Sequence, residues 1–150
     1  MSNESESKLT FHTWSLQPNQ SDKFSSNLHP TISYHSIKYS DKTLYIWIGD
    51  GESKIENLSC SMKTPFDDEP STCDLLMVNN QDSDYINLSN DLAGKLAKRL
   101  KKQVLVGFNV KIDPQQLVPE LNNNNSTHNN LLFLIEKRII EEIKKNPQYF

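Results

Sequence analysis

The stretch LYIWIGDGESK, residues 44–54, decides the fold because it places an apolar strand directly before a glycine turn. Successive side chains of an extended chain point to opposite faces of a sheet. The side chains on one face are Leu44, Ile46 and Ile48, and those on the other are Tyr45 and Trp47. Neither set favours water, so the pattern predicts a strand from a sheet that is apolar on both faces.

The glycines of this stretch first suggest a loop that binds phosphate. Such a loop needs four residues between its first glycine and a Gly-Lys-Ser/Thr end, so that backbone N–H groups surround the anion. Here Asp50 and Glu52 stand where the anion would lie, and no helical pattern begins at Ser53. We therefore predict a hairpin turn at Asp50-Gly51, because glycine adopts positive φ without penalty.

Apolar and polar residues alternate in several other segments, as they do in strands. With the strand that starts at Thr43, the predicted strands are Leu9–Leu16, Thr31–Tyr39, Leu58–Met62, Leu75–Val78 and Gln103–Val110. The segment Leu75–Val78 is continuously apolar, which predicts burial on both of its faces. The short turn Ser40-Asp41-Lys42 between two strands favours an antiparallel meander.

Two segments late in the chain change to helical spacing. The first runs through residues 87–103, with Asn87 or Ser89 as its predicted N-cap. Its apolar stripe consists of Leu92, Ala93, Leu96, Ala97 and Leu100. The second helix places Leu132, Ile135, Ile139 and Ile143 on one face, and Asn146-Pro147 ends it.

The order of these elements predicts an α+β fold, with an approximately six-stranded, mainly antiparallel meander sheet and two amphipathic helices packed on one face. Residues 1–8 are polar, which predicts a disordered N-terminal tail. Residues 9–150 then form a single domain. The asparagine-rich segment at 113–130 predicts a mobile loop within it.

Composition excludes several classes of function. The chain has 150 residues, a hydrophobic fraction of 35% and a formal net charge of −3. This charge is too small to indicate attraction to nucleic acid or to an anionic membrane. No apolar run approaches the roughly 20 residues of a membrane-spanning helix, and the N-terminus lacks the pattern of a secretory signal. We expect a cytoplasmic protein that could also be nuclear, with Cys60 and Cys73 as reduced thiols.

No residue pattern indicates a reaction, a metal or a cofactor. The histidines His12 and His35 and the cysteines Cys60 and Cys73 are scattered singly, without the spacing of metal ligands. The sequence contains no GxSxG motif, and its four glycines offer few strained catalytic turns. We therefore expect neither an enzyme nor a cofactor, although a serine and a histidine on neighbouring strands remain an open alternative.

The first helix carries a cluster of cations near its C-terminal end. They are Lys95, Lys98, Arg99, Lys101 and Lys102. No aromatic residue is interleaved with them for base stacking, so nucleic acid is not favoured as a partner. Two interpretations stay open, a solvated helix face and a contact with an acidic protein through Lys98 and Arg99.

The sheet has more apolar surface than two helices can cover. If the helices cover the face of Leu44, the opposite face still carries Tyr45, Trp47 and Leu105. A broad apolar patch left in water favours aggregation, so loops or another protein must cover it. We predict that Tyr45, Trp47 and Leu105 bind a partner protein, with Lys98 and Arg99 as further contacts.

Two parts of the chain resemble the proteasome assembly chaperone 4 family. The C-terminal half reads LAGKLAKRLKKQVLVGFNV (residues 92–110) and then LLFLIEKRIIEEIKKNPQYF (residues 131–150). Lys102-Gln103 before a valine-rich strand, the pair Phe108-Asn109 and the Pro147 to Phe150 end are similar to the family. ISYHSIKYSDKTLYIWIG (residues 32–49) also resembles it. The similarity covers most of residues 9–150, and residues 113–130 look like an insertion.

This resemblance implies a non-enzymatic chaperone. It would pair with a proteasome assembly chaperone 3 homologue, and the heterodimer would guide an alpha-type subunit into the ring of the core proteasome. The alternative from another class is a longin- or roadblock-like adaptor for a small GTPase, which would also have a small sheet, helices and a dimer face. An enzyme would need a pocket beside His12 or His35.

Overall fold

The computed structural model describes residues 9–16, 31–51, 54–66, 68–77, 83–110 and 131–150. These residues form six strands, two α-helices and a short 3-10 helix, η3. The elements are β1 (Thr10–Leu16), β2 (Ile32–Ser40), β3 (Thr43–Gly49), β4 (Asn57–Met62), β5 (Ser71–Met77), α1 (Ser83–Leu100), β6 (Gln103–Asn109), α2 (Leu131–Lys145) and η3 (Pro147–Tyr149). The predicted tail at residues 1–8 and the predicted loop at residues 113–130 lie outside the described residues.

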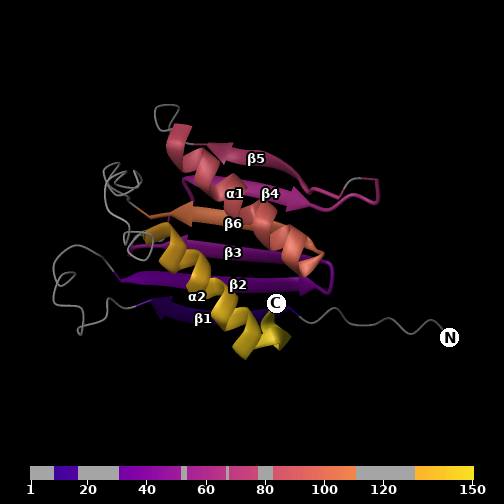
Figure 1. The fold of residues 1–150 in the computed structure, drawn as a ribbon. Helices are drawn as coiled ribbons and strands as arrows, with labels where there is room; N and C mark the ends of the chain where they lie inside the picture. The colour runs from indigo at the N-terminus through magenta and orange to yellow at the C-terminus, as the bar shows by residue number, and fades with distance from the viewer. Residues whose placement is uncertain (1–8, 17–30, 52–53, 67, 78–82, 111–130) are drawn as a thin grey trace, which may run out of the picture.

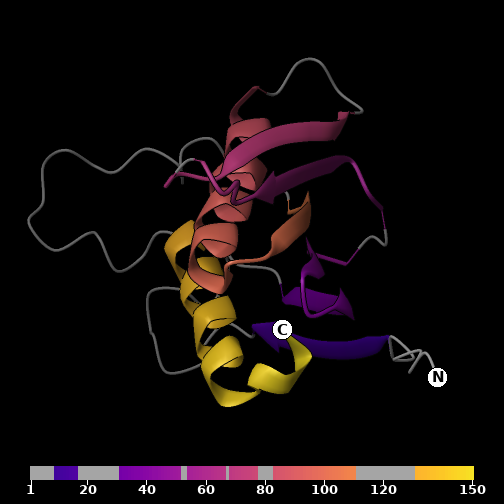
Figure 2. The same cartoon turned by 90° about the vertical axis from the view of Figure 1, so that its right-hand side faces the viewer.

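The strands form one sheet in the order β1-β2-β3-β6-β4-β5. Figure 1 shows α1 and α2 side by side in front of this sheet, and the turned view in Figure 2 shows that both lie on the same face. The predicted α+β class, the six strands and the two helices on one face are therefore confirmed. Every neighbouring pair of strands is antiparallel except β3 and β6, which are parallel.

The position of β6 is the main difference from the predicted meander. It lies between β3 and β4, so the turn at Asp50-Gly51 does not join two paired strands. Gly51 does adopt the positive φ expected of it, 125°. A parallel pair requires a crossover, and the segment from β4 through α1 supplies it before the chain returns as β6.

The hydrophobic core lies between the sheet and the two helices. Alternate residues of the central strands face this layer, and Leu44, Ile46 and Ile48 of β3 are fully buried. The residues that complete the core are Trp14, Ile32, Tyr34, Leu92, Ala93, Leu96, Ala97, Val104, Val106, Phe108, Val110, Ile135, Ile139 and Phe150. Trp14 stacks on Tyr34 with ring centroids 5.1 Å apart. The apolar stripe predicted on the first helix thus faces the sheet, as do Ile135, Ile139 and Ile143 of the stripe predicted on the second.

An ionic cluster fixes the end of α2 against β1. His12 Nε2 and Glu142 Oε1 lie 2.8 Å apart, and the Glu142 side chain is only 5% exposed. The Asn146 amide donates a hydrogen bond to the same carboxylate at 2.6 Å. Burial by itself raises the pKa of Glu142, but the hydrogen bonds of His12 and Asn146 and the charge of Arg138 outweigh it, so the pKa is lowered.

Two details of the elements differ from the sequence prediction. The strand predicted at Leu75–Val78 begins earlier, at Ser71, and the prediction that it is buried on both faces was wrong: β5 is an edge strand, with Leu75 53% exposed. The helix α1 starts at Ser83, so Asn87 and Ser89 lie inside it and neither is the N-cap.

No helix in the described ranges has the length and apolar character needed to cross a bilayer.

Candidate interaction surface

One face of the sheet is left uncovered by α1 and α2, and we call it the open face (Figure 2). The side chains that alternate with the buried residues of β3 and β6 point to it. Tyr45 and Leu105 are direct cross-strand partners at its centre, and Trp47 lies opposite Gly107. The structure therefore brings together Tyr45, Trp47 and Leu105, the three sheet residues predicted from the sequence to bind a partner.

The strand registers place an unbroken row of side chains across the open face. Each residue of this row is the register partner of the next, from β1 to β5: Phe11, Ile37, Tyr45, Leu105, Cys60 and Cys73. We call these six residues the apolar row. Phe11 is 65% exposed at one edge, whereas Ile37, Tyr45 and Leu105 are partly exposed. A continuous apolar strip of this kind is typical of a protein interface.

Tyr45 combines an apolar ring with a polar end at the centre of this row. Burial, and to a smaller extent the neighbouring Tyr39, raise the pKa of the Tyr45 hydroxyl above its usual value. Since that value is near 10, the hydroxyl is neutral and protonated at physiological pH. It can therefore donate a hydrogen bond to a partner while the ring packs against apolar atoms.

Trp47 is less accessible than the sequence suggested. Its side chain is 9% exposed although it lies on the open face. The indole Nε1–H donates a hydrogen bond to the Lys54 backbone oxygen at 2.8 Å. A Cβ at Gly49 would come within 2.2 Å of the indole ring, so only glycine leaves room for it there. Trp47 thus packs against its own chain, and its predicted role in partner binding stays a prediction.

Lys98 and Arg99, the other two residues predicted to bind a partner, lie on α1 in the opposite layer. The structure does not bring them together with the residues of the open face. Lys98 forms an ion pair with Glu69 from the loop between β4 and β5. Arg99 is exposed and forms no ion pair within the described part of the chain. The predicted set of contact residues therefore divides between two surfaces.

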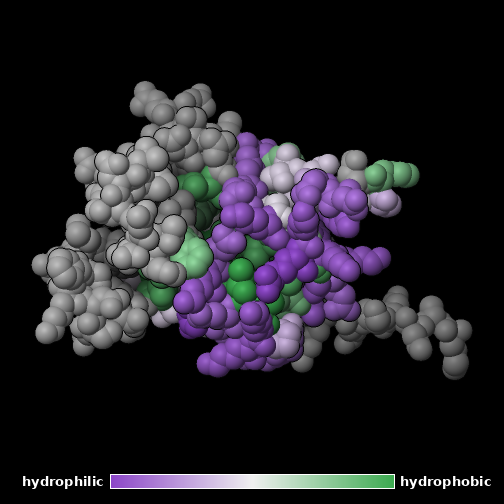
Figure 3. All heavy atoms as spheres, in the orientation of Figure 1, coloured by the Kyte–Doolittle hydropathy of each residue, from purple (hydrophilic) through white to green (hydrophobic). Residues whose placement is uncertain are grey.

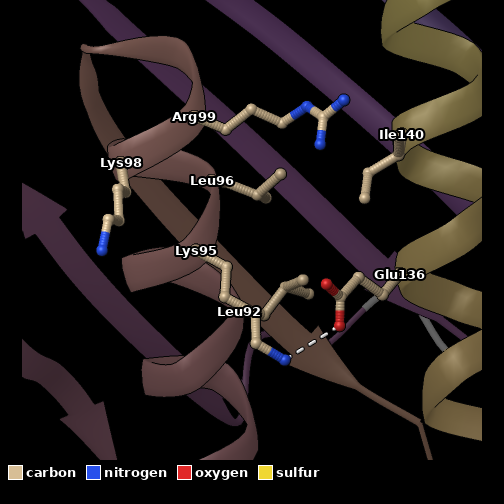
Figure 4. Close-up of a pocket in the computed structure, with 7 residues that line it drawn as sticks. All are labelled: Leu92, Lys95, Leu96, Lys98, Arg99, Glu136 and Ile140. Atoms are coloured by element: carbon tan, nitrogen blue, oxygen red, sulfur yellow. Dashed lines mark hydrogen bonds and ion pairs between the residues drawn. The ribbon is translucent and has the colours of Figure 1, made fainter.

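A groove of about 310 Å³ separates α1 from α2. Leu92, Leu96 and Ile140 line it, and Figure 3 shows hydrophobic atoms between the hydrophilic surfaces of this layer. Lys95 closes one part of the rim through 2.9 Å ion pairs with Asp91 and Glu136. Figure 4 shows the Arg99 side chain reaching across the groove toward α2, while Lys98 points away from it.

His12 and His35, the two histidines in the described ranges, both contact neighbouring side chains of the fold. The ring of His12 stacks on Tyr149, with centroids 4.4 Å apart, and on Trp14 at 5.2 Å. His35 is exposed on the open face, where its Nδ1 lies 3.1 Å from the Thr13 hydroxyl. Among the described residues, no group of three or more His, Cys, Asp and Glu side chains could hold a metal ion. The rings of His12 and His35 thus pack and hydrogen-bond within the fold.

Sequence reasoning missed Phe11, Ile37 and the two cysteines as members of the apolar row. Alternation within β1 assigns Phe11 to one face, but only the pairing of Phe11 with Ile37 connects it to the centre of the sheet. Cys60 and Cys73 join the row because β4 pairs with both β6 and β5. These alignments depend on strand order, which the local pattern does not encode.

Comparison with known proteins relates the chain to one family. The family model described as proteasome assembly chaperone 4 matches residues 31–110, which include β2 to β6 and α1. The chain belongs to the proteasome assembly chaperone 4 family. It is 29% identical to the human proteasome assembly chaperone 4 over 119 residues, which are 79% of this chain and 80% of the human protein. The mouse protein is 28% identical over the same share of each chain.

A solved structure supports the fold independently of the family model. It is a chain from the crystal structure of a novel chaperone complex for yeast 20S proteasome assembly. The TM-score is 0.62, and the match covers 91% of this chain and 96% of the yeast complex chain. At 12% sequence identity the likeness shows that the two chains share a fold.

Proposed function

We propose that this protein is a proteasome assembly chaperone that acts by pairing with a proteasome assembly chaperone 3 homologue. The heterodimer then promotes assembly of the alpha-subunit ring of the core proteasome and contacts an alpha-type subunit. Membership of the chaperone family supports the general role. The yeast complex chain with the same fold comes from a chaperone complex for 20S proteasome assembly, which supports action within a complex.

The open face is the surface we propose for pairing with the chaperone 3 homologue. The observation that carries this proposal is the apolar row, of which Phe11 and Cys73 are exposed and Ile37, Tyr45 and Leu105 are partly exposed on the face that α1 and α2 do not cover. Complete burial of one large apolar side chain contributes roughly 1.5–3 kcal/mol. Burial of Phe11, Tyr45 and Leu105 together would therefore contribute several kcal/mol before the cost of association is subtracted.

The helical layer is the surface we propose for an acidic region of the alpha-type subunit. Arg99 forms no ion pair with the described residues, so a carboxylate of the partner could bind it bidentately. Lys98 would have to exchange Glu69 for a partner, and we expect it to contribute less than Arg99. With two separate surfaces, one chaperone molecule could bind both partners at once.

We further propose that this function involves no reaction, cofactor or metal, and that it takes place in the cytoplasm, with the nucleus as a second possible location. His12 and His35, beside which an enzyme would need a pocket, are engaged in packing and hydrogen bonds, which supports this proposal. Family membership favours the chaperone function over the alternative of a longin- or roadblock-like adaptor for a small GTPase.

Co-purification of the tagged chain, with mass spectrometry of the proteins it retains, tests this function. We expect a chaperone 3 homologue and at least one alpha-type proteasome subunit. Tyr45→Asp should remove the chaperone 3 homologue, whereas Phe133→Asp should retain it. Phe133 is the control because it is an aromatic residue with an accessible side chain, 46% exposed, on α2 in the opposite layer. A stable monomer without either partner, or nucleotide-dependent retention of a small GTPase, would refute the proposal.

A further inference from the structure

The two cysteines of the chain have no motif spacing in the sequence, but they are direct neighbours in the sheet. Cys60 of β4 is the register partner of Cys73 of β5, and both are free thiols. Residues directly opposite each other in an antiparallel pair project to the same face of the sheet. The two thiols therefore lie side by side at the β5 end of the apolar row.

The backbone geometry of such a pair suits a disulfide. Directly opposite residues in antiparallel strands have Cα atoms about 4.5 Å apart in one kind of pair and about 5.5 Å apart in the other. A disulfide requires a Cα separation of about 4.4–6.8 Å. Both kinds of pair fall within this range, so Cys60 and Cys73 can be joined by rotation of their side chains with little backbone movement.

The two thiols differ in access, which gives them different roles in an oxidation. Cys73 is exposed on the edge strand β5. Cys60 is 8% exposed, and its Sγ accepts a hydrogen bond from the Gln103 Nε2 amide at 3.4 Å. An oxidant in solution therefore reaches Cys73 first. Cys60 is positioned to react afterwards, after its side chain turns from Gln103 toward β5.

We propose that Cys60 and Cys73 form a dithiol site that a low-molecular-weight disulfide such as glutathione disulfide converts into an intrachain disulfide. The Cys73 thiolate attacks one sulfur of glutathione disulfide, forms a mixed disulfide and releases one glutathione thiolate. The Cys60 thiolate then attacks the Cys73 sulfur, which forms the Cys60–Cys73 bond and releases the second glutathione. Two protein thiols are oxidised and one glutathione disulfide is reduced to two glutathione molecules.

The bond would change the edge of the open face. It would join β5, the last strand of the sheet, covalently to β4 and close the loop that contains Phe66. It would also replace the accessible thiol of Cys73 by an apolar disulfide next to Leu105, the register partner of Cys60 on β6. The pairing of Cys60 with Cys73 and the difference in their access do not depend on the proposed function.

Incubation of the purified full-length chain with glutathione disulfide, followed by intact mass measurement without reductant, tests the site. We expect a product lighter than the reduced chain by two hydrogens, with no free thiol. Trypsin cleaves after Lys63, between the two cysteines. The peptides that contain Cys60 and Cys73 should therefore appear linked to each other, and they should separate when dithiothreitol is added.

Two single variants test the order of the steps. Cys60→Ser should stop at a glutathione adduct on Cys73, and Cys73→Ser should keep a free thiol at Cys60 because that side chain is buried. A wild-type chain that accumulates the Cys73 adduct, joins a second chain or keeps both thiols would overturn the proposal. If Cys60 in Cys73→Ser reacted with glutathione disulfide as fast as Cys73 does in Cys60→Ser, the assigned roles would be wrong.

Discussion

The two faces of the sheet are made by the same strands but have different environments. On β3, Leu44, Ile46 and Ile48 are completely buried beneath the helices, whereas Tyr45, between them in sequence, is partly exposed on the other side. On β6, Val104 and Val106 are buried and Leu105 is partly exposed. Both faces are apolar, but only one is sealed by the described helices (Figure 2).

Because the two faces differ in exposure, we expect the covered face to contribute mainly to the stability of the fold and the open face to partner binding. Residues on the covered face lose contact with water when the chain folds, so they contribute to the free energy of folding. The residues of the apolar row other than Cys60 keep part of their surface in water, so that surface is still available to be buried when a partner binds. This chain belongs to a family of assembly chaperones, and the open face is the surface that we propose for its partner.

The largest predicted effect contrasts neighbouring residues on the two faces. Ile46→Ala should lower the free energy of unfolding by about 2–5 kcal/mol, because it removes a fully buried side chain and leaves a cavity. Tyr45→Ala should cost about 1 kcal/mol, since the ring is partly exposed. Urea denaturation of the two variants gives both values. Equal losses would mean that the open face is as well covered as the helical one.

The second prediction concerns Trp47, the buried exception on the open face. Trp47→Ala should lower the free energy of unfolding by about 3 kcal/mol, because the indole is enclosed by its own chain. Trp47→Phe keeps a ring but loses the hydrogen bond to the Lys54 oxygen, and should cost about 1 kcal/mol. Thermal and urea unfolding measure both. A neutral effect of Trp47→Ala would instead identify Trp47 as an accessible contact.

The third prediction concerns how the free energy of unfolding depends on pH through Glu142, which lies on the covered face. Because the pKa of Glu142 is lowered in the folded chain, the carboxylate stabilises the fold above its unfolded pKa of about 4.3. This stabilisation is lost as the pH falls through the folded pKa. Glu142→Gln should therefore be less stable than the wild type at pH 7, by about 1–2 kcal/mol.

The difference between Glu142→Gln and the wild type should shrink as the pH falls below 4.3, about the value for an unperturbed glutamate. His12, Asn146 and Arg138, the groups that contact this carboxylate, are unchanged in the variant. Urea denaturation at a series of pH values follows the difference. A gap that is constant with pH would show that the charge of Glu142 does not contribute.

The smallest predicted effect on stability is at the rim of the helical groove. Arg99→Ala should change the free energy of unfolding by less than about 0.5 kcal/mol, because Arg99 is exposed and forms no ion pair with the described residues. If the proposed acidic contact is correct, the same variant should bind the alpha-type subunit more weakly. Loss of stability without a change in binding would assign Arg99 to the fold alone.

The fold class could be predicted from the sequence because local patterns report which side chains share a face. Alternation in β3 and β6 separated Tyr45 and Leu105 from the buried residues, and helical spacing located the stripe that includes Leu96. The partner-binding residues proposed on the sheet therefore lie together, as expected. Their role in binding stays a prediction.

The strand order could not be predicted, because it depends on pairing between distant segments. The position of β6 between β3 and β4 brings Leu105 next to Cys60, and no local pattern indicates this contact. Exposure was also misjudged where it depends on neighbours. Trp47 is covered because Lys54 returns to it, and Leu75 is exposed because β5 is an edge strand.

The most direct test of the central claim is the affinity of Leu105→Asp for the chaperone 3 homologue, measured by calorimetry on a variant shown by urea denaturation to be folded. Leu105 lies at the centre of the apolar row. We predict that affinity falls at least about tenfold, a loss of about 1.4 kcal/mol, while Phe133→Asp binds as the wild type does. A folded Leu105→Asp that binds with unchanged affinity would contradict the assignment of the open face as the docking surface.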